Sequence, residues 1–220
     1  MAISTTYFTF AYKLYWPLVA TSNSAVWILV FFHILFAMVL WSFFQSILTD
    51  PGQVPPYWGF YMGDPEHKRK RYCLMCHVFK PDRCHHCSAC NRCVLNMDHH
   101  CPWINNCVGF GNRKIFMLLL FYVTLTVYFV LTFMLPTVYK TVIGFWSEEI
   151  NMTLYPSMLY IGVFLMLSML AFLITVFIKF HIGLIFQNST TIENMEAQQL
   201  KAKASQEVKN LPKNYDVGYL

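Results

Sequence analysis

The side chains best suited to chemistry gather in one short stretch of the chain, between residues 73 and 107. All eight cysteines lie there, together with four candidate histidine ligands. The candidates are Cys73, Cys76, Cys84, His85, His86, Cys87, Cys90, Cys93, His99, His100, Cys101 and Cys107. Cysteines spaced two residues apart can point two thiolates at one ion, and zinc prefers four sulfur or nitrogen ligands in a tetrahedron. Few aliphatic residues separate the candidates, so metal must supply much of the folding free energy. We therefore predict that this stretch binds zinc.

An iron–sulfur cluster is the alternative metal site. The cysteines from residue 84 to residue 93 repeat every three positions, and a proline follows Cys101, as in the cysteine run of ferredoxin-type clusters. The abundance of candidate histidine ligands favours zinc, and visible absorbance would reveal iron.

Two tetrahedral sites would use eight of the twelve candidates and leave the others for a different role. A thiol beside an imidazole becomes a nucleophile when the imidazole takes its proton or stabilises the thiolate, and a carboxylate can orient the ring. Asp98, His99 and Cys101 supply these groups within four residues. We predict that they act as a catalytic triad. The alternative, in which Cys101 is another ligand and His99 only supports a ligand, stays open at this point.

Long apolar stretches flank the cysteine-rich stretch and must position it. The chain is 56% hydrophobic and 12% charged, and this charged fraction is about half that of soluble proteins. Three uncharged stretches, at 25–48, 115–135 and 157–178, have the roughly 20 apolar residues needed to cross a bilayer. We predict an all-α integral membrane protein with three transmembrane helices and a small zinc module. The predicted order is an N-terminal stub or partial span (1–24), a span (25–48), the zinc module (49–114), a span (115–136), a short outer loop (137–156), a span (157–178) and a tail (179–220).

Basic residues set the predicted orientation in the membrane. Loop 49–114 holds nine Lys and Arg and the tail adds five, whereas loop 137–156 has only Lys140. By the positive-inside rule, the zinc module and the tail face the cytosol. Thiols stay reduced there, so the cysteines are expected to bind metal or catalyse rather than to form disulfides. The net charge of +5 indicates attraction to anionic lipid, and no basic and aromatic pattern indicates nucleic acid. A nucleophile between two spans lies at the membrane–cytosol boundary, where a thiolate can attack a lipid thioester.

Residues 71–116, "RYCLMCHVFKPDRCHHCSACNRCVLNMDHHCPWINNCVGFGNRKIF", closely resemble the cysteine-rich domain of the DHHC protein S-acyltransferases, or palmitoyltransferases. Two flanking motifs agree with this family. Asp50-Pro51-Gly52 resembles its Asp-Pro-Gly after the preceding span, and Thr190-Thr191-Ile192-Glu193 resembles its Thr-Thr-x-Glu after the last span. The spans, loop and tail lie where the family has them, so the resemblance extends over most of the chain.

The resemblance implies two structural zinc sites, each made of three cysteines and one histidine. The first set is Cys73, Cys76, His86 and Cys93, and the second is Cys87, Cys90, His100 and Cys107. The two sets interleave along the chain, so two ions would cross-brace the module. Cys84 remains as a non-ligand, and neither zinc is catalytic because protein ligands fill its coordination sphere.

The resemblance also implies a ping-pong acyl transfer. Cys101, activated by His99 with Asp98 orienting the imidazole, takes the acyl group from acyl-CoA (palmitoyl-CoA). A cysteine of a substrate protein then attacks the acyl-enzyme.

Further candidate residues surround this centre. Lys80, Arg83 and His85 are candidates for holding the phosphates of CoA, with a solvated module surface as the alternative. Trp103 is a candidate for lining the acyl cavity, with a structural aromatic at the membrane interface as the alternative. His33, within the first clear span, is expected to make an interhelical hydrogen bond.

The chain departs from the family pattern at both ends. The family usually has four or more spans, and residues 2–12 are interpreted as a remnant of the first. Residues 214–218 resemble the start of a C-terminal aromatic motif whose remainder is missing, which we interpret as a truncation of the sequence.

The expected partners are membrane lipids, acyl-CoA and cytosolic or membrane-bound proteins with an accessible cysteine. The expected location is an endomembrane (endoplasmic reticulum or Golgi) or the plasma membrane, with the active site on the cytosolic face. The sequence does not set the oligomeric state. The other functions considered are a zinc-braced membrane adaptor without activity, and a metal-handling or redox membrane protein.

Overall fold

The computed structural model describes residues 2–59, 71–147 and 154–210. The expected C-terminal motif at 214–218 lies outside these residues. The chain divides into two compact units. The first comprises Met1–Asp50 and Gly111–Phe180, and the second comprises Pro51–Phe110 and His181–Leu220.

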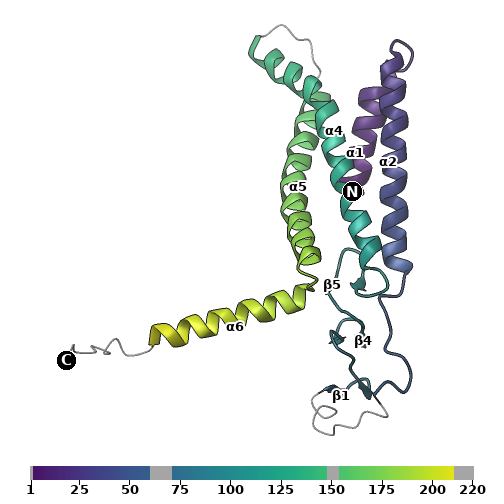
Figure 1. The fold of residues 1–220 in the computed structure, drawn as a ribbon. Helices are drawn as coiled ribbons and strands as arrows, with labels where there is room; N and C mark the ends of the chain where they lie inside the picture. The colour runs from purple at the N-terminus through teal and green to yellow at the C-terminus, as the bar shows by residue number, and fades with distance from the viewer. Residues whose placement is uncertain (1, 60–70, 148–153, 211–220) are drawn as a thin grey trace, which may run out of the picture. The chain divides into compact units, whose positions relative to one another are not determined.

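Three long apolar helices dominate the chain: α2 (Asn23–Leu48), α4 (Arg113–Ser147) and α5 (Leu154–Phe186) (Figure 1). Their most apolar windows have mean hydropathies of 2.3, 2.3 and 2.7, so all three are long and apolar enough to cross a membrane. At about 1.5 Å per residue, even the shortest, with its 26 residues, exceeds the roughly 30 Å of a hydrocarbon core. The predicted fold class, a mostly helical membrane protein with three spans and a small Cys/His-rich module, is confirmed.

The core of the first unit joins four segments of the chain. The N-terminal segment consists of α1 (Ala2–Tyr7), the π-helix η1 (Phe8–Tyr15) and the short 3₁₀ helix η2 (Trp16–Leu18). Phe10 of this segment packs on Phe32 of α2 with ring centroids 4.8 Å apart, and Met134 of α4 and Leu167 of α5 join the same buried cluster. The N-terminal stub is therefore a helical segment packed on the spans. Lipid tails are as apolar as these side chains, so the hydrophobic effect does not drive the helices together in a membrane. Close van der Waals packing stabilises such contacts instead.

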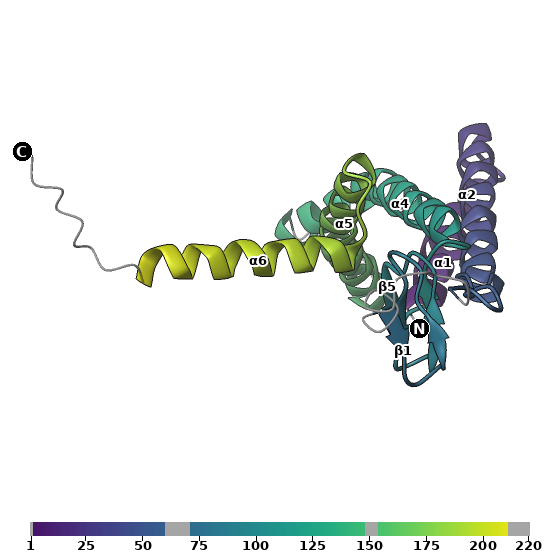
Figure 2. The same cartoon turned by 60° about the horizontal axis from the view of Figure 1, so that its bottom comes forward.

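Helices α2 and α4 pack along each other (Figures 1 and 2). The amide of Asn112, just before α4, donates to the backbone oxygen of Ser46 near the end of α2 at 3.5 Å. Helix α2 ends at Leu48 because Pro51 follows closely, and a residue that precedes proline avoids helical backbone angles. The end of α2 and the start of α4 are thus neighbours. The Cys/His-rich module lies between them in the sequence.

Helix α4 is longer than the sequence predicted. We expected a span ending at Pro136 and a short loop over 137–156, but α4 continues through Pro136 to Ser147, and α5 begins at Leu154. A proline inside a helix removes one backbone hydrogen bond and kinks the helix without necessarily ending it. Neighbouring helices and threonine side chains compensate for such breaks in membrane spans.

The Cys/His-rich module in the second unit is built from three antiparallel hairpins. They pair β1 (Tyr72–Cys73) with β2 (Val78–Phe79), β3 (His85–Cys87) with β4 (Arg92–Val94), and β5 (His99–Cys101) with β6 (Asn106–Val108). The same unit contains the polar helix α6 (Thr191–Asn210).

The Asp-Pro-Gly segment packs closely against the module. The backbone N–H of Leu95 donates to the oxygen of Gly52 at 3.2 Å. A Cβ atom at Gly109 would lie 2.7 Å from the oxygen of Pro51 and 2.7 Å from Cγ1 of Val94. Gly52 has φ of 119°, a backbone conformation that side chains disfavour. Glycine at both positions therefore lets the strands and the entry segment meet.

Candidate functional site

The first candidate metal centre lies at the base of hairpins β1–β2 and β3–β4. Its donor atoms, which all lie within 4.8 Å of one another, belong to Cys73, Cys76, His86 and Cys93. The Nδ1 atom of His86 is 3.2 Å from Sγ of Cys76 and 3.7 Å from Sγ of Cys73. Strand register places His86 directly opposite Cys93, so one hairpin supplies two ligands side by side.

The second candidate metal centre repeats this arrangement with the next hairpin. Its donor atoms belong to Cys87, Cys90, His100 and Cys107, again within 4.8 Å of one another. The Nδ1 atom of His100 is 3.4 Å from Sγ of Cys90 and 3.7 Å from Sγ of Cys107. His100 is paired with Cys107 across the β5–β6 ladder.

These two groups are the same eight residues that the family resemblance implied. Hairpin β3–β4 gives His86 and Cys93 to the first group, while Cys87, the last residue of β3, belongs to the second. Three thiolates and one imidazole in so small a space form a donor set that suits a tetrahedral, thiophilic ion such as zinc. The structure thus contains two groups that can each hold a metal ion and join the hairpins.

Cys84 is the cysteine beside the first group that is not one of its donors. Its side chain is 3% exposed and packs in a buried cluster with Cys73 and Cys93. Burial raises the pKa of this thiol above its ordinary value, against the lowering effects of a hydrogen bond with Cys93 and nearby Lys80 and Arg71. Cys84 is therefore a neutral packing residue at pH 7.

The Asp98 carboxylate is the most deeply buried charged group of the site, with no exposed surface. Its Oδ2 accepts a hydrogen bond from Nδ1 of His99 at 2.7 Å and from the hydroxyl of Thr191 at 2.7 Å, while Oδ1 accepts from the Thr191 N–H at 3.0 Å. Burial alone would raise the pKa of Asp98, but the hydrogen bonds from His99 and Thr191 outweigh it and lower the pKa to about 2. Asp98 is therefore ionised at pH 7.

His99 and Cys101 point the same way because they sit two residues apart on β5, where side chains alternate between faces. The intervening His100 points to the other face, toward its cysteine group. One strand thus gives two adjacent histidines opposite surroundings. This alternation explains how the sequence His99-His100 can serve two different chemical tasks.

The electrostatics of this face favour a thiolate–imidazolium pair. Burial would lower the pKa of His99, but hydrogen bonds with Asp98 and Cys101 outweigh it and raise the pKa to about 9. Burial would raise the pKa of Cys101, but the hydrogen bond from His99 and the backbone N–H groups of Ile104 and Trp103 outweigh it, so the pKa is lowered. A thiol with a depressed pKa beside a positively charged imidazole is a nucleophile ready at neutral pH.

Sequence reasoning missed two residues that lie beside the Asp98 carboxylate. Thr191 was identified only as part of a flanking motif, and it holds both oxygens of Asp98. His181, near the end of α5, is buried with Nδ1 3.9 Å from Oδ2 of Asp98. Both lie more than 80 residues away from Asp98 along the chain. No local spacing could have connected them, although the Thr-Thr-x-Glu motif marks one of the two positions.

The expected CoA contacts differ in their surroundings. The Arg83 guanidinium forms a two-pronged ion pair with Glu193, with Nε–Oε1 and Nη2–Oε2 distances both of 2.7 Å. The pKa of His85 is lowered, chiefly by burial, so its imidazole is neutral at pH 7. Lys80 is partly exposed, and Trp103 is 86% exposed in the turn of β5–β6. Arg83 thus connects the module to the start of α6, a role that the sequence did not suggest.

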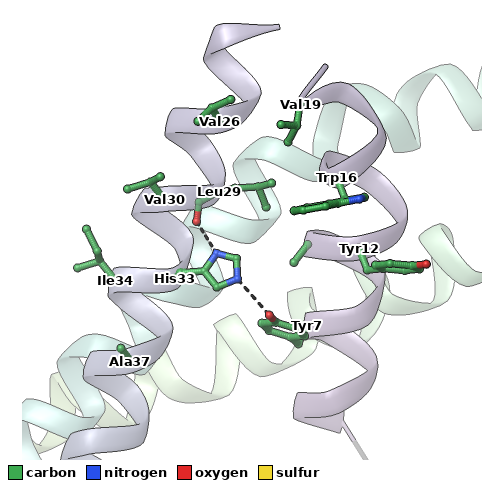
Figure 3. A pocket seen from close by; sticks show the side chains of 11 residues that line it. Tyr7, Tyr12, Trp16, Val19, Val26, Leu29, Val30, His33, Ile34 and Ala37 are labelled. Carbon is green, nitrogen blue, oxygen red and sulfur yellow. Dashed lines mark hydrogen bonds between the residues drawn. The ribbon is translucent and has the colours of Figure 1, made fainter. Parts of the chain in front are cut away.

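His33 makes the interhelical hydrogen bond that the sequence predicted. Its Nδ1 lies 2.7 Å from the backbone oxygen of Leu29, and its Nε2 lies 3.0 Å from the hydroxyl of Tyr7 (Figure 3). These residues line an apolar groove of about 820 Å³ between the N-terminal segment and α2. His33 thus belongs to the first unit and is separate from the Asp98–His99–Cys101 site.

Comparison with known proteins identifies relatives of this chain. The family model described as DHHC palmitoyltransferase matches residues 66–198, more than half of the chain. Probable protein S-acyltransferase 14 of Arabidopsis thaliana is 37% identical over 198 residues, which cover 80% of this chain and 63% of the relative. Probable protein S-acyltransferase 12 of the same plant is 36% identical over 211 residues, which cover 87% of this chain and 71% of the relative. Human palmitoyltransferase ZDHHC20 is 35% identical over 200 residues, which cover 77% of this chain and 53% of the relative.

The chain thus spans little more than half to about seven tenths of the length of these relatives. The matched region contains both candidate metal groups, the Asp98–His99–Cys101 face and the Thr191–Glu193 segment. The family model, these relatives and the geometry of the site together show that the chain belongs to the DHHC palmitoyltransferase family.

Proposed function

We propose that this chain is a protein S-acyltransferase that moves a long-chain acyl group, palmitoyl, from acyl-CoA to cysteine thiols of proteins through a thioester on Cys101. The observation that carries the proposal is the buried chain of hydrogen bonds from Thr191 through Asp98 and His99 to Cys101. It supports a thiolate nucleophile with a proton donor beside it. The relatives' names as S-acyltransferases and palmitoyltransferases support the choice of reaction.

The first half-reaction uses the thiolate–imidazolium pair as it stands. The Cys101 thiolate attacks the thioester carbonyl of acyl-CoA, and the bond between the acyl carbon and the CoA sulfur breaks. The His99 imidazolium gives its proton to the departing CoA thiolate, which leaves as the free thiol. Asp98 remains ionised throughout and holds the His99 ring.

The second half-reaction runs through the same groups in reverse. Neutral His99 takes the proton of a substrate cysteine, whose sulfur attacks the acyl-Cys101 thioester. The bond to Cys101 breaks, the acyl group stays on the substrate, and the Cys101 thiolate again faces the His99 imidazolium. Atoms and charge balance without any further reactant.

We assign zinc to the two Cys/His groups because their donors are three thiolates and an imidazole each. When bound, such ions crosslink the hairpins and leave no open coordination position for substrate. Cys87 and Cys90 precede His99 and Cys107 follows Cys101, so the second group flanks β5 on both sides in the sequence.

The proposed location follows from the distribution of charge. The basic loop and tail favour a cytosolic module between membrane spans, so that an acyl chain can lie among the helices while CoA remains in water. Of the three candidate phosphate contacts, Arg83 is paired with Glu193 and His85 is neutral. Lys80 is therefore the principal candidate for attracting CoA, and Trp103 remains a candidate for contact with the acyl chain.

A labelling experiment tests this function. The purified zinc-loaded chain in detergent or vesicles is incubated with labelled palmitoyl-CoA, and hydroxylamine-sensitive label is measured. We expect label in the wild type and in Cys84→Ala, a matched buried cysteine outside both metal groups, and none in Cys101→Ala. Equal labelling of Cys101→Ala would refute the assignment. An unlabelled wild type that retains its metal would instead favour the adaptor without activity.

A further inference from the structure

His181 occupies a position that the mechanism has not used. It lies near the end of α5 and is 2% exposed. Its ring centroid is 5.7 Å from that of His99, with the rings inclined by 46°, and its Nδ1 is 3.9 Å from Oδ2 of Asp98. A second imidazole, besides that of His99, thus faces the Asp98 carboxylate.

The surroundings of Asp98 show what this imidazole does. Oδ2 faces three groups from three segments: Nδ1 of His99 on β5, the Thr191 hydroxyl on α6 and Nδ1 of His181 on α5. The distance of 3.9 Å is too long for a direct hydrogen bond. It is close enough for the imidazole dipole or charge to favour the carboxylate, because interactions are strong where water is excluded. Both side chains are buried, so the ring occupies space directly beside the carboxylate.

The segment between His181 and Thr191 is itself held in place. Backbone bonds close a turn after α5, from the N–H of Asn188 to the oxygen of Ile185 at 3.0 Å and from the N–H of Ser189 to that of Leu184 at 2.9 Å. Arg83 donates to the backbone oxygen of Asn188 at 2.7 Å while it pairs with Glu193. His181 and Thr191 therefore reach Asp98 from the two ends of one anchored turn.

We propose that His181 is a positioning residue for acyl transfer, which holds Asp98 in the conformation that orients His99 toward Cys101. The inference rests on the proposed function for its effect on rate. That His181 positions Asp98 can be tested even if acyl transfer is not observed. When a side chain that orients a functional residue from behind is removed, activity typically falls about 10- to 100-fold.

Two substitutions separate the polar contact from packing. His181→Leu keeps an apolar side chain in the buried space without a polar atom, and His181→Asn places an amide nitrogen near the position of Nδ1. We expect the single-turnover rate of Cys101 acylation to fall about 10- to 100-fold in His181→Leu and to recover largely in His181→Asn. The KM for acyl-CoA and the content of two metal ions per chain should not change. His33→Asn, a histidine change in the first unit, is the matched control and should acylate like the wild type.

A double-mutant cycle decides whether His181 works through Asp98. In the Asp98→Asn background, His181→Leu should cause no further loss, because the carboxylate that it positions is gone. Independent, multiplied losses in the double variant would overturn the proposal. So would equal rates in wild type and His181→Leu, or a His181→Asn variant as slow as His181→Leu.

Two further measurements distinguish a positioning role of His181 from metal binding and from failure of the proposed function. Asp98, His99 and His181 also bring their donor atoms within 4.8 Å of one another. A third tightly held metal ion, lost in His181→Leu, would show that His181 is a ligand and would overturn the positioning role. If the wild type does not acylate itself, the rate at which iodoacetamide modifies Cys101 at pH 7 gives the same comparison. A slower rate in His181→Leu, restored in His181→Asn, then supports positioning even though the proposed function has failed.

Discussion

At the scale of single residues, the site depends on the alternation of one short strand. His99 and Cys101 share a face of β5, and His100 between them points to a cysteine group. The sequence could suggest that adjacent histidines have different duties, but only the pleat of the strand explains how they are separated. The hydrogen bonds that Asp98 accepts from His99 and Thr191 keep its buried carboxylate ionised, and this carboxylate raises the pKa of His99.

Substitution of each adjacent histidine should separate these duties. His99→Ala should keep two metal ions per chain and lose acylation of Cys101 by at least about 100-fold, because the nucleophile loses its proton partner. His100→Ala should lose one ion together with the fold of the β5–β6 hairpin. Metal content measured by mass spectrometry on purified protein distinguishes them. Metal loss to the same extent in both variants would contradict the assignment.

The reactivity of Cys101 should persist at a lower pH than that of an ordinary thiol. Its pKa is lowered below 9.0 by His99 and backbone N–H groups against the effect of burial. In His99→Ala the lowering effect of the imidazole is removed, so the pKa of Cys101 should rise relative to the wild type. The pH dependence of alkylation by iodoacetamide, followed on the Cys101 peptide, should therefore shift to higher pH in the variant. An unchanged profile would show that His99 does not activate the thiol.

The Asp98–His99 ion pair should give folding stability a defined pH range. The pKa of His99 is raised from 6.5 to about 9, so its contribution is full below 6.5 and is lost as the pH rises through about 9. The pKa of Asp98 is lowered from 3.8 to about 2, so its contribution is present above 3.8 and is lost as the pH falls through about 2. The melting temperature of the zinc-loaded chain should fall between about pH 6.5 and pH 9, and His99→Leu should remove that part of the decrease. A decrease of equal size in the variant would contradict the pair.

At the scale of elements, the structure adds contacts that no local pattern contains. The resemblance named the same eight residues that form the two candidate metal groups, and it placed Asp98 beside His99, which the structure brings within 2.7 Å. It did not predict that His181 and Thr191 converge on Asp98, because they are separated from it by 83 and 93 residues, and such proximity is a property of the folded chain. Helix α4 also continues past Pro136, the predicted end of the span, because a proline weakens a helix at one position without necessarily ending it.

Thr191→Val should test the contact between α6 and the catalytic strand. It removes the hydroxyl that donates to Asp98 and keeps both the side-chain shape and the backbone N–H bond. A hydrogen bond to a charged group contributes about 1.5–3 kcal/mol, so acylation should fall by about tenfold or more. Thr191→Ser, which retains the hydroxyl, should stay near the wild-type rate. Equal rates in the two variants would contradict the role of the hydroxyl.

Gly109→Ala should test the close approach between the module and the Asp-Pro-Gly segment. An added Cβ would meet backbone and side-chain atoms at 2.7 Å, and overpacking of this kind costs about 1–3 kcal/mol. Thermal unfolding of the zinc-loaded chain should reveal the loss. Gly162→Ala, where nothing lies within 4 Å of the added atom, is the control and should not destabilise the protein. Similar melting of both variants would refute the contact.

At the scale of the whole molecule, two compact units have different sources of stability. Apolar helices pack on one another in the first, whereas the Cys/His-rich hairpins have small apolar clusters built partly from the metal-ligand cysteines themselves. Metal removal should therefore unfold the module and leave the spanning helices folded. The apolar helices α2 and α4 lie wholly in the first unit, and both Cys/His groups lie in the second.

The most direct test of the central claim is the intact mass of the zinc-loaded chain after a single exposure to palmitoyl-CoA. The account predicts the addition of one palmitoyl group, removable by hydroxylamine and located on the peptide that contains Cys101. It further predicts that the addition is unaffected by Cys84→Ala and absent in Cys101→Ala. A palmitoyl group on a different cysteine, or none on a wild-type chain that holds its metal, would contradict the account.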